Sequence, residues 1–225
     1  MLKAILFDAY GTLISTGNGS VQAVQTILQN AGRTDLDPKA FYARWKQYHR
    51  QHMDELKAFV TEEELFRRDL QALYIEYGIS GDPYGEVQPM LDTLGRRTAF
   101  PETRQVLERL SERYRVCIAS TSDTAPLLQD VQRNGLTVHR IFTSEELRVY
   151  KPQPAFYRSI LSQLKLSPEE TLFVGDSPVD DVQGPQDIGI PACWLNRKGA
   201  EKPAHLFPAH IASDLHQVCN FIENF

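Results

Sequence analysis

The chain has 225 residues, of which 42% are hydrophobic and 24% are charged, and its formal net charge is −5 at pH 7. This composition is typical of a globular protein, and the length allows one large domain or a core domain with an insertion. The arginine pairs at 67–68 and 96–97 are too small for the basic field of a nucleic-acid binder, and no apolar run reaches membrane-spanning length. Cys117, Cys193 and Cys219 form no CxxC pair, and the apolar strand-like runs around Cys117 and Cys193 predict buried thiols rather than disulfides or a metal site. We therefore expect a soluble cytoplasmic protein that binds neither nucleic acid nor membranes.

The first predicted element is a buried strand at 4–7, a short apolar run that ends abruptly at Asp8. Gly11 and Thr12 follow at once. Ligands of open α/β sheets bind at the carboxyl ends of the strands. Asp8 is therefore expected at a ligand site, where Gly11 lets the backbone turn close to whatever Asp8 contacts.

Residues 15–95 carry helical patterns and no strand-like alternation. After a polar loop at 15–20, helices are expected at 21–31, continuously over 37–77, and at 87–94. An aromatic stripe of helical spacing, formed by Phe41, Trp45, Tyr48 and His52, is interpreted as core. This block is predicted to be an all-helical domain.

Beyond Pro101 the pattern alternates between helices and strands. Helices are expected at 102–113, 125–134, 156–164 and 182–188 and from Leu215, and strands at 116–119, 141–142, 171–174, 191–195 and 211–212. Such alternation predicts parallel strands joined by crossover helices. The expected fold is α/β, with a three-layer Rossmann-like parallel sheet core (residues 1–14 and 96–225) and an inserted all-helical domain (residues 15–95).

Reactive side chains follow three of the predicted strands. Asp8 ends the first, Ser120 and Thr121 end the second, and Asp176 ends a later one, while Lys151 stands in the loop before a proline. Two facing carboxylates repel each other unless a cation lies between them, and Mg²⁺ accepts one or two carboxylates together with phosphate oxygens. Hydroxyl, amide and ammonium groups would bind a transferring anion, and Asp8 could attack it as a carboxylate nucleophile.

Four short segments resemble the four motifs of the haloacid dehalogenase-like (HAD) hydrolase superfamily, in order and at plausible spacing. They are 7–13 (FDAYGTL), 119–121 (AST), 151–152 (KP) and 175–181 (GDSPVDD). The helical block is similar to the cap that one subclass inserts between the first two motifs. The resemblance implies that Asp8 is the nucleophile, Ser120 the hydroxyl of the second motif, Lys151 the group that orients nucleophile and anion, and Asp176 an acidic metal ligand.

The resemblance leaves two candidates, Asp180 and Asp181, for the second aspartate of the fourth motif. The implied Mg²⁺ ligands are Asp8, the backbone carbonyl of Tyr10, Asp176 and Asp181. The expected catalytic residues are Asp8, Tyr10, Ser120 and Lys151. Substrate contacts are expected from Gly11, Thr12 and Thr121. Two structural alternatives stay open: Thr12 could cap a turn, and Asp180 or Asp181 could cap the helix near residue 182.

Two features depart from the family pattern in opposite directions. Family phosphatases carry an acid–base aspartate two residues after the nucleophile, and Tyr10 occupies that position here. In this respect the chain resembles the metal-free L-2-haloacid dehalogenases. Tyr157 also resembles a dehalogenase position, although its apolar surroundings favour packing. The acidic Asp176, in contrast, differs from the dehalogenase pattern, because a further carboxylate facing Asp8 requires a cation.

A dehalogenase also needs a cap arginine near its substrate, and neither Arg44 nor Lys46 fits the spacing. We therefore expect a Mg²⁺-dependent phosphatase that acts on a small phosphate ester through an aspartyl-phosphate intermediate, as a monomer or homodimer. The alternatives are a metal-free 2-haloacid dehalogenase with Asp8 as nucleophile and a catalytically weak binding or scaffold member of the superfamily.

Overall fold

The computed structural model describes residues 1–225, and the chain divides into two compact units. The α/β unit consists of Met1–Ser15, Thr98–Thr121 and Val131–Phe225. The helical unit consists of Thr16–Arg97 and Ser122–Asp130. None of the helices combines the length and the apolar character that crossing a membrane requires.

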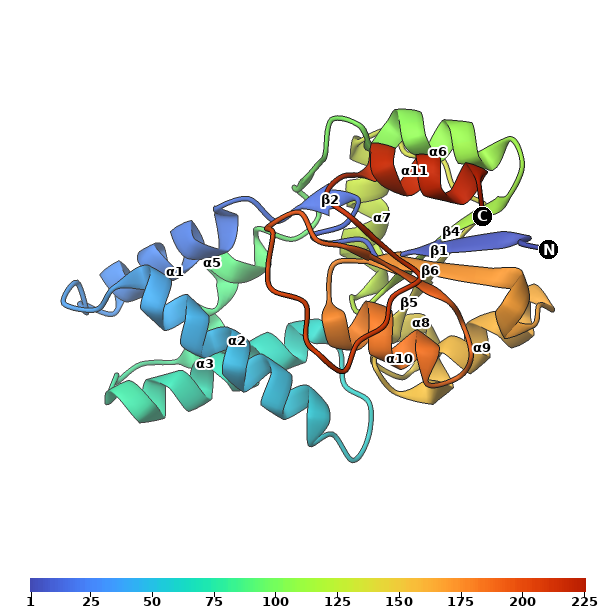
Figure 1. Cartoon of the computed structure of the whole chain (residues 1–225). Helices are drawn as coiled ribbons and strands as arrows, with labels where there is room; N and C mark the ends of the chain where they lie inside the picture. Colours follow the sequence, from blue (N-terminus) through green and yellow to red (C-terminus); the bar gives the residue numbers. More distant parts are fainter. The chain divides into compact units, whose positions relative to one another are not determined.

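The α/β unit is built on a six-stranded sheet in the order β5-β4-β1-β6-β7-β8. Its strands are β1 (Ala4–Phe7), β4 (Arg115–Ser120), β5 (Arg140–Thr143), β6 (Thr171–Gly175), β7 (Ala192–Leu195) and β8 (His210–Ala212). All neighbouring pairs are parallel, so every predicted strand and the predicted parallel sheet are confirmed (Figure 1). Since β1 lies between β4 and β6, the residues that follow these three strands meet at one edge of the sheet.

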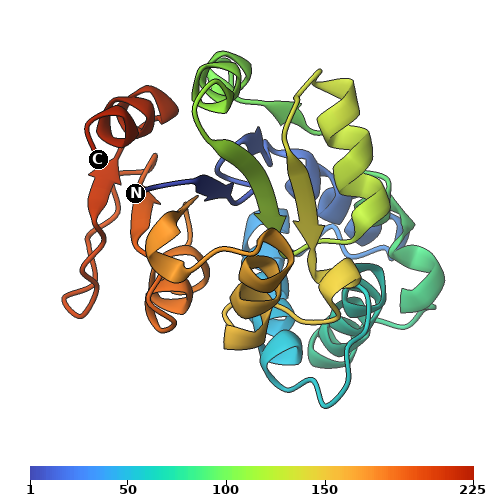
Figure 2. The same ribbon diagram turned by 90° about the vertical axis from the view of Figure 1, so that its right-hand side faces the viewer.

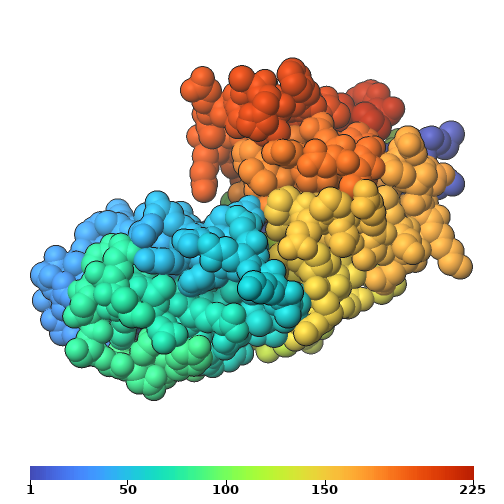
Figure 3. Space-filling view, turned by 90° about the horizontal axis from the view of Figure 1, so that it is seen from below, coloured from blue at the N-terminus to red at the C-terminus, as the bar shows by residue number.

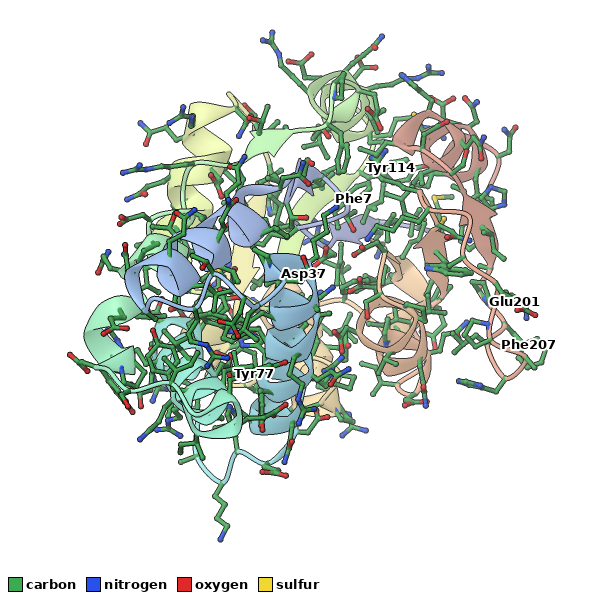
Figure 4. All side chains as sticks on the ribbon, turned by 90° about the vertical axis from the view of Figure 1, so that its left-hand side faces the viewer. Phe7, Asp37, Tyr77, Tyr114, Glu201 and Phe207 are labelled. Atoms are coloured by element: carbon green, nitrogen blue, oxygen red, sulfur yellow. The ribbon has the colours of Figure 1, made fainter.

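Helices cover both faces of this sheet, which confirms the three-layer Rossmann-like core. Figure 2 shows α6 (Thr103–Ser111) and α11 (Leu215–Glu223) on one face, and α9 (Pro154–Leu164) and α10 (Gly184–Gln186) on the other. Alternation along β1 sends Ala4 and Leu6 towards the α9 side, where they pack with Phe156, Tyr157 and Ile160. Figure 4 labels Phe7, the last residue of β1, which is fully buried.

The three cysteines are buried and free, which confirms the prediction made for Cys117 and Cys193. Cys117 and Cys193 lie within β4 and β7. Cys219 lies in α11.

The helical unit contains α1 (Gly19–Asn30), α2 (Pro38–Asp54), α3 (Glu62–Tyr77), α4 (Pro83–Glu86) and α5 (Gln88–Leu91). In Figure 4 the labels Asp37 and Tyr77 mark the residue before α2 and the last residue of α3. Phe41 and Trp45 are fully buried in its core, as the aromatic stripe predicts. The space-filling view shows α2 and α3, in light blue to cyan, on the surface of this unit (Figure 3).

The prediction of one continuous helix over 37–77 is wrong, because the helix is interrupted between Asp54, where α2 ends, and Glu62, where α3 begins. A new helix, α3, begins at Glu62, and its N-cap is Thr61, whose Oγ1 accepts a hydrogen bond from the backbone N–H of Glu64 (3.3 Å). The Thr-x-x-Glu sequence at 61–64 is typical of such a start, and helical periodicity on both sides hides it.

The segment Ser122–Asp130 groups with the helical unit for a local reason. The Asp123 carboxylate accepts hydrogen bonds from the backbone N–H groups of Glu62 (2.8 Å) and Glu63 (3.0 Å) at the start of α3. Asp130 Oδ1 accepts one from the N–H of Arg97 (2.7 Å). As a result α7 (Thr124–Arg133) begins in the helical unit and ends in the α/β unit.

A short antiparallel ribbon was not expected from the sequence. It pairs β2 (Ile14–Ser15) with β3 (Thr98–Ala99), at the two positions where the chain passes between the units. The Leu13 carbonyl strengthens it by accepting hydrogen bonds from the N–H of Phe100 (3.0 Å) and from Thr103 Oγ1 (2.8 Å). Two-residue strands carry too little pattern for periodicity to reveal.

Candidate active site

Asp8 follows β1 directly and is 6% exposed. Its backbone N–H donates to the carbonyl of Val174 on the neighbouring β6 (2.9 Å), which fixes where the side chain starts. The chain then turns sharply: the Ala9 carbonyl accepts hydrogen bonds from the N–H groups of Leu13 (2.9 Å) and Ile14 (2.8 Å). We call residues 9–14 the nucleophile turn.

Gly11 has a backbone reason to be glycine in this turn. Its φ is +94°, and a Cβ on this residue would lie 2.7 Å from Cγ of Asp176. Side chains are disfavoured both by the left-handed conformation and by the lack of space. Gly11 therefore lets the nucleophile turn lie directly against the Asp176 carboxylate.

The fourth motif forms a turn after β6 that selects between its two aspartates. A π-helical turn over Pro178–Gln183 follows Ser177, whose Oγ accepts a hydrogen bond from the N–H of Asp180 (3.1 Å). In return, the N–H of Ser177 donates to Asp181 Oδ2 (2.9 Å). Ser177 is thus the N-cap, and the expectation that Asp180 or Asp181 occupies that position is wrong.

Asp181 faces the other motif residues and is 1% exposed. The backbone carbonyl of Asp180 instead accepts a hydrogen bond from the hydroxyl of Tyr157 (2.5 Å). The tyrosine ring packs edge-on against Phe156 and Phe173, which agrees with the packing role expected for it.

Lys151 joins the first and fourth motifs. Its Nζ lies 2.9 Å from Asp8 Oδ1 and 2.7 Å from Asp181 Oδ1, and the residue is only 2% exposed. The ammonium also lies 5.2 Å from the centre of the Phe173 ring. Lys151 is 143 residues from Asp8 and 30 residues from Asp181 in the sequence, and its buried ammonium contacts both carboxylates.

The site holds more negative than positive charge. Ligand oxygens of Asp8, Asp176 and Asp181 all lie within 4.8 Å of one another. Burial alone would lower the pKa of Lys151, but Asp181 and Asp8 raise it well above its ordinary value, so the ammonium stays charged. Burial, with the charge of Asp8, raises the pKa of Asp176 to about 6. Burial also raises the pKa of Asp181 well above its ordinary range, despite the opposing effect of Lys151.

These residues fit a hard divalent cation. The buried Asp8 Oδ2 has no hydrogen-bond partner, although an uncompensated buried carboxylate oxygen is costly. Carboxylate oxygens are the ligands that Mg²⁺ prefers, and a cation among them would satisfy Oδ2 and reverse the pKa shifts of Asp176 and Asp181. The Tyr10 carbonyl as a further ligand stays a prediction.

The remaining predicted residues lie around this cluster. Ser120 ends β4 and is 1% exposed, and Thr121 follows it. Thr12 is fully buried and its Oγ1 has no hydrogen-bond partner, so this hydroxyl does not cap the turn. Tyr10 lies in the nucleophile turn and is half-buried.

The two basic cap residues considered for a dehalogenase have partners within the helical unit. Arg44 Nε lies 2.9 Å from Glu76 Oε2. Lys46 Nζ lies 5.3 Å from the centre of the Tyr42 ring.

Sequence reasoning missed two residues that contact the motif turns. Trp194 Nε1 donates to the backbone carbonyl of Asp176 (3.0 Å), and Arg197 Nη2 donates to that of Thr12 (3.0 Å). Trp194 lies in β7, the strand next to β6, and Arg197 follows the end of that strand. This position was their only available signal.

A sequence profile of the haloacid dehalogenase-like hydrolases matches residues 2–189. The chain belongs to this family. The HAD resemblance seen in the four motifs is thereby confirmed, and the protein is a HAD-like hydrolase.

Relatives of this HAD-like hydrolase fall into different activity classes. It is 28% identical over 219 residues to the pyrimidine 5'-nucleotidase PynA of Streptococcus pneumoniae, covering 92% of this chain and 90% of that protein. It is 26% identical over 209 residues to the (S)-2-haloacid dehalogenase 4A of Burkholderia cepacia, covering 88% and 84%. The magnesium-bound structure of the HAD-hydrolase YfnB of Bacillus subtilis superposes with a TM-score of 0.84 at 20% identity, covering 99% of each chain.

Proposed function

We propose that this HAD-like hydrolase is a Mg²⁺-dependent phosphatase of small phosphate esters. The observation that carries the proposal is the charge balance: three carboxylates lie within 4.8 Å of one another, and Lys151 is the ammonium that bridges two of them. A buried group with this excess of negative charge is costly unless a cation joins it. The magnesium-bound YfnB structure, which shares the fold, agrees with this proposal.

Asp8 acts as the nucleophile in the proposed reaction. Its carboxylate oxygen forms a bond to phosphorus while the bond from phosphorus to the ester oxygen breaks, which leaves an aspartyl phosphate. Water then attacks the phosphorus, inorganic phosphate leaves, and the Asp8 carboxylate is restored. When bound, Mg²⁺ would supply positive charge that offsets the carboxylates and the phosphate oxygens.

Lys151 has two tasks in this scheme. Held between Asp8 and Asp181, its ammonium offsets their negative charge and holds the nucleophile in one orientation. Ser120 and Thr121, at the end of the adjacent β4, are proposed to donate hydrogen bonds to the phosphate oxygens. Gly11 and Thr12 are proposed to contact the substrate from the nucleophile turn.

A second candidate function is metal-free 2-haloacid dehalogenation, in which Asp8 displaces halide from carbon and water cleaves the resulting ester. Tyr10 favours it, since a phenol stands where family phosphatases carry their acid–base aspartate. Its sequence support is comparable, because both a nucleotidase and a dehalogenase are relatives over most of the chain. The third carboxylate, Asp176, decides our preference for the phosphatase.

The deciding experiment is a turnover screen with three substrates, each with Mg²⁺ and with chelator. The substrates are 4-nitrophenyl phosphate, uridine 5'-monophosphate (because of the nucleotidase relative) and 2-chloropropionate. We expect phosphate release that requires Mg²⁺ and disappears in Asp8→Asn. Halide release that chelator leaves unchanged would instead establish the dehalogenase. Absence of turnover on all three, with Mg²⁺ binding retained, would favour a binding or scaffold role.

A further inference from the structure

The chain segment that ends β7 contacts two turns of the active site at once. Trp194 donates its indole N–H to the carbonyl of Asp176 (3.0 Å), which carries the acid of the fourth motif. Three residues on, Arg197 donates from Nη2 to the carbonyl of Thr12 (3.0 Å) in the nucleophile turn. Neither side chain is part of the carboxylate cluster, so each contacts the site only through a backbone carbonyl.

Arg197 is held firmly in place. Its Nη1 lies 2.8 Å from Glu102 Oε1, and its Cζ lies 3.7 Å from the centre of the Phe100 ring. The side chains of Arg197 and Glu102 are only 17% and 13% exposed. Because a guanidinium is planar and rigid, the carboxylate and the ring together determine where the Nη2 donor points.

The Thr12 carbonyl is a sensitive place to hold the nucleophile turn. Thr12 follows Gly11, whose Cα faces Asp176 so closely that a Cβ would lie 2.7 Å from its Cγ. A displacement of the Thr12 backbone would move the adjoining Gly11, which has no spare room against the Asp176 carboxylate. At the other end of the turn, Asp8 is fixed by its N–H bond to Val174 (2.9 Å).

Much of the connection from β7 to β8 is exposed, although Leu206 packs in a core cluster with Ala192 and Trp194. Figure 4 labels Glu201 and Phe207 on this outer loop, and the space-filling view shows the same orange-red segment on the surface (Figure 3). Phe207 is 75% exposed. The inward position of Arg197 is therefore a local feature and is not imposed by burial of the whole loop.

We propose that Arg197 is a positioning residue for catalysis, which sets the nucleophile turn against Asp176 through the Thr12 carbonyl. Trp194 is its counterpart for the turn that carries Asp176. The proposal rests on the proposed function in that Asp8 and Asp176 are taken as the working carboxylates. It adds two residues, from outside the four motifs, that determine their mutual geometry.

The test compares Arg197→Gln and Arg197→Lys with the matched control Arg104→Gln, which removes an arginine exposed on α6. We expect Arg197→Gln to lower kcat by about 10²-fold with little change in KM, because a small displacement of the reacting groups costs about this much. It should also raise the Mg²⁺ concentration for half-maximal stabilisation against heat, a readout independent of turnover. Arg197→Lys should retain part of the wild-type kcat and of the Mg²⁺ response, and Arg104→Gln should change neither quantity.

A second variant addresses Asp176. Trp194→Phe keeps an aromatic ring and removes the indole donor, so it should weaken Mg²⁺ binding while leaving the fold intact. The inference would be overturned if Arg197→Gln lowered thermal stability but left kcat and Mg²⁺ binding of the folded protein at wild-type values. Failure of the proposed function looks different, because wild-type protein would then release no phosphate. If it releases halide, the same variants are measured on 2-chloropropionate.

Discussion

Gly11 and Asp176 lie in van der Waals contact although 165 residues separate them, and a Cβ on residue 11 would lie 2.7 Å from the Asp176 Cγ. The contact joins the nucleophile turn to the acidic turn without any hydrogen bond between side chains. It also makes the identity of residue 11 a test of how closely the two turns must approach.

Gly11→Ala is expected to abolish Mg²⁺-dependent turnover, since the new methyl group displaces the Asp176 carboxylate. The left-handed φ of +94° adds about 1–2 kcal/mol of backbone strain. Gly135→Ala is the matched control, because Gly135 has φ +61° and nothing within 4 Å of its added Cβ. Both variants should lose some thermal stability, but only Gly11→Ala should lose Mg²⁺ binding. Equal activity in the two would contradict the required contact.

Lys151→Met tests the charge balance of the site. Removing the buried ammonium leaves Asp8 and Asp181 without a counter-charge, so the free energy of unfolding in chelator should fall by about 3–5 kcal/mol. Adding Asp181→Asn to this variant should restore part of the loss, because one of the two unpaired carboxylates is then removed. Urea denaturation of the single and double variants provides the measurement. Additive losses would mean that the Lys151–Asp181 contact carries no coupling.

Mg²⁺ stabilisation should depend on pH in a defined direction. The pKa of Asp176 is about 6 in the metal-free fold, above its ordinary value of about 3.9. Between these values the folded state binds the extra proton, so metal-free stability falls as pH rises, and the full cost is present above pH about 6. Mg²⁺ requires the ionised carboxylate and should raise the melting temperature most above that pH, progressively less below it.

The control for this pH dependence is Asp176→Asn, which removes the titrating group. Its melting temperature should rise little with Mg²⁺ at any pH. If Mg²⁺ raised the melting temperature of the wild-type protein as much at pH about 5 as at pH about 7.5, protons would not compete with Mg²⁺ for Asp176.

Much of the site could be predicted because its residues follow buried strands. Apolar runs ending in Asp8, Ser120 and Asp176 are readable one at a time, and the rule that parallel strands share an edge brings them together. The choice between Asp180 and Asp181 could not be made in this way. It depends on a π-helical turn capped by Ser177, and the two aspartates are equivalent as sequence.

Contacts made through the backbone were out of reach for the sequence. Arg197 donates a hydrogen bond to the backbone carbonyl of Thr12, 185 residues away in the sequence. Every residue has such a carbonyl, so the sequence does not mark this one as a partner. The helical unit shows the same limit: the stripe that includes His52 was interpreted as core, yet His52 Nδ1 lies 2.6 Å from the fully buried Asp69. Periodicity identifies which face of a helix is inward, and it does not identify polar partners inside.

His49 should make the helical unit less stable as pH rises. Its Nδ1 lies 2.7 Å from Asp69 Oδ2, which also accepts the indole N–H of Trp45 (3.1 Å). Burial lowers the pKa of His49, but the hydrogen bond and charge of Asp69, aided by Glu62, outweigh it and raise the pKa above its ordinary value. The stabilisation is thus complete below pH about 6.5 and is lost as pH rises through the folded-state pKa.

This prediction is measured by urea unfolding at several pH values, with Trp45 fluorescence as the probe in a Trp194→Phe background. His49→Gln should flatten the pH dependence, whereas His139→Gln, in the α/β unit, should leave it unchanged. Asp69→Asn should cost about 3–5 kcal/mol at pH about 6, since it removes a buried charged partner. A pH profile that His49→Gln leaves unaltered would assign the effect to another group.

Tyr10 determines which phosphate esters the proposed phosphatase should prefer. Because Tyr10 stands two residues after Asp8, no carboxylic acid at that position protonates the leaving oxygen. A phenol with an ordinary pKa of about 10 is also a poor general base at neutral pH. Substrates whose leaving groups need no proton, such as aryl or acyl phosphates, should therefore react faster than alkyl phosphates. The measurement is kcat/KM for 4-nitrophenyl phosphate relative to that for uridine 5'-monophosphate.

Tyr10→Asp should restore the acid and raise turnover of the alkyl ester more than that of the aryl ester, by about 10²-fold at most. The smaller side chain also removes a half-buried ring from the nucleophile turn, so KM should rise for both substrates alike. Tyr10→Asn is the matched control, since it is equally small and supplies no proton; it should raise KM without the selective gain. The ratio of the two kcat values separates acid catalysis from loosened binding. If wild-type protein already hydrolyses both esters equally well, another residue supplies the proton and Tyr10 is not the limiting position.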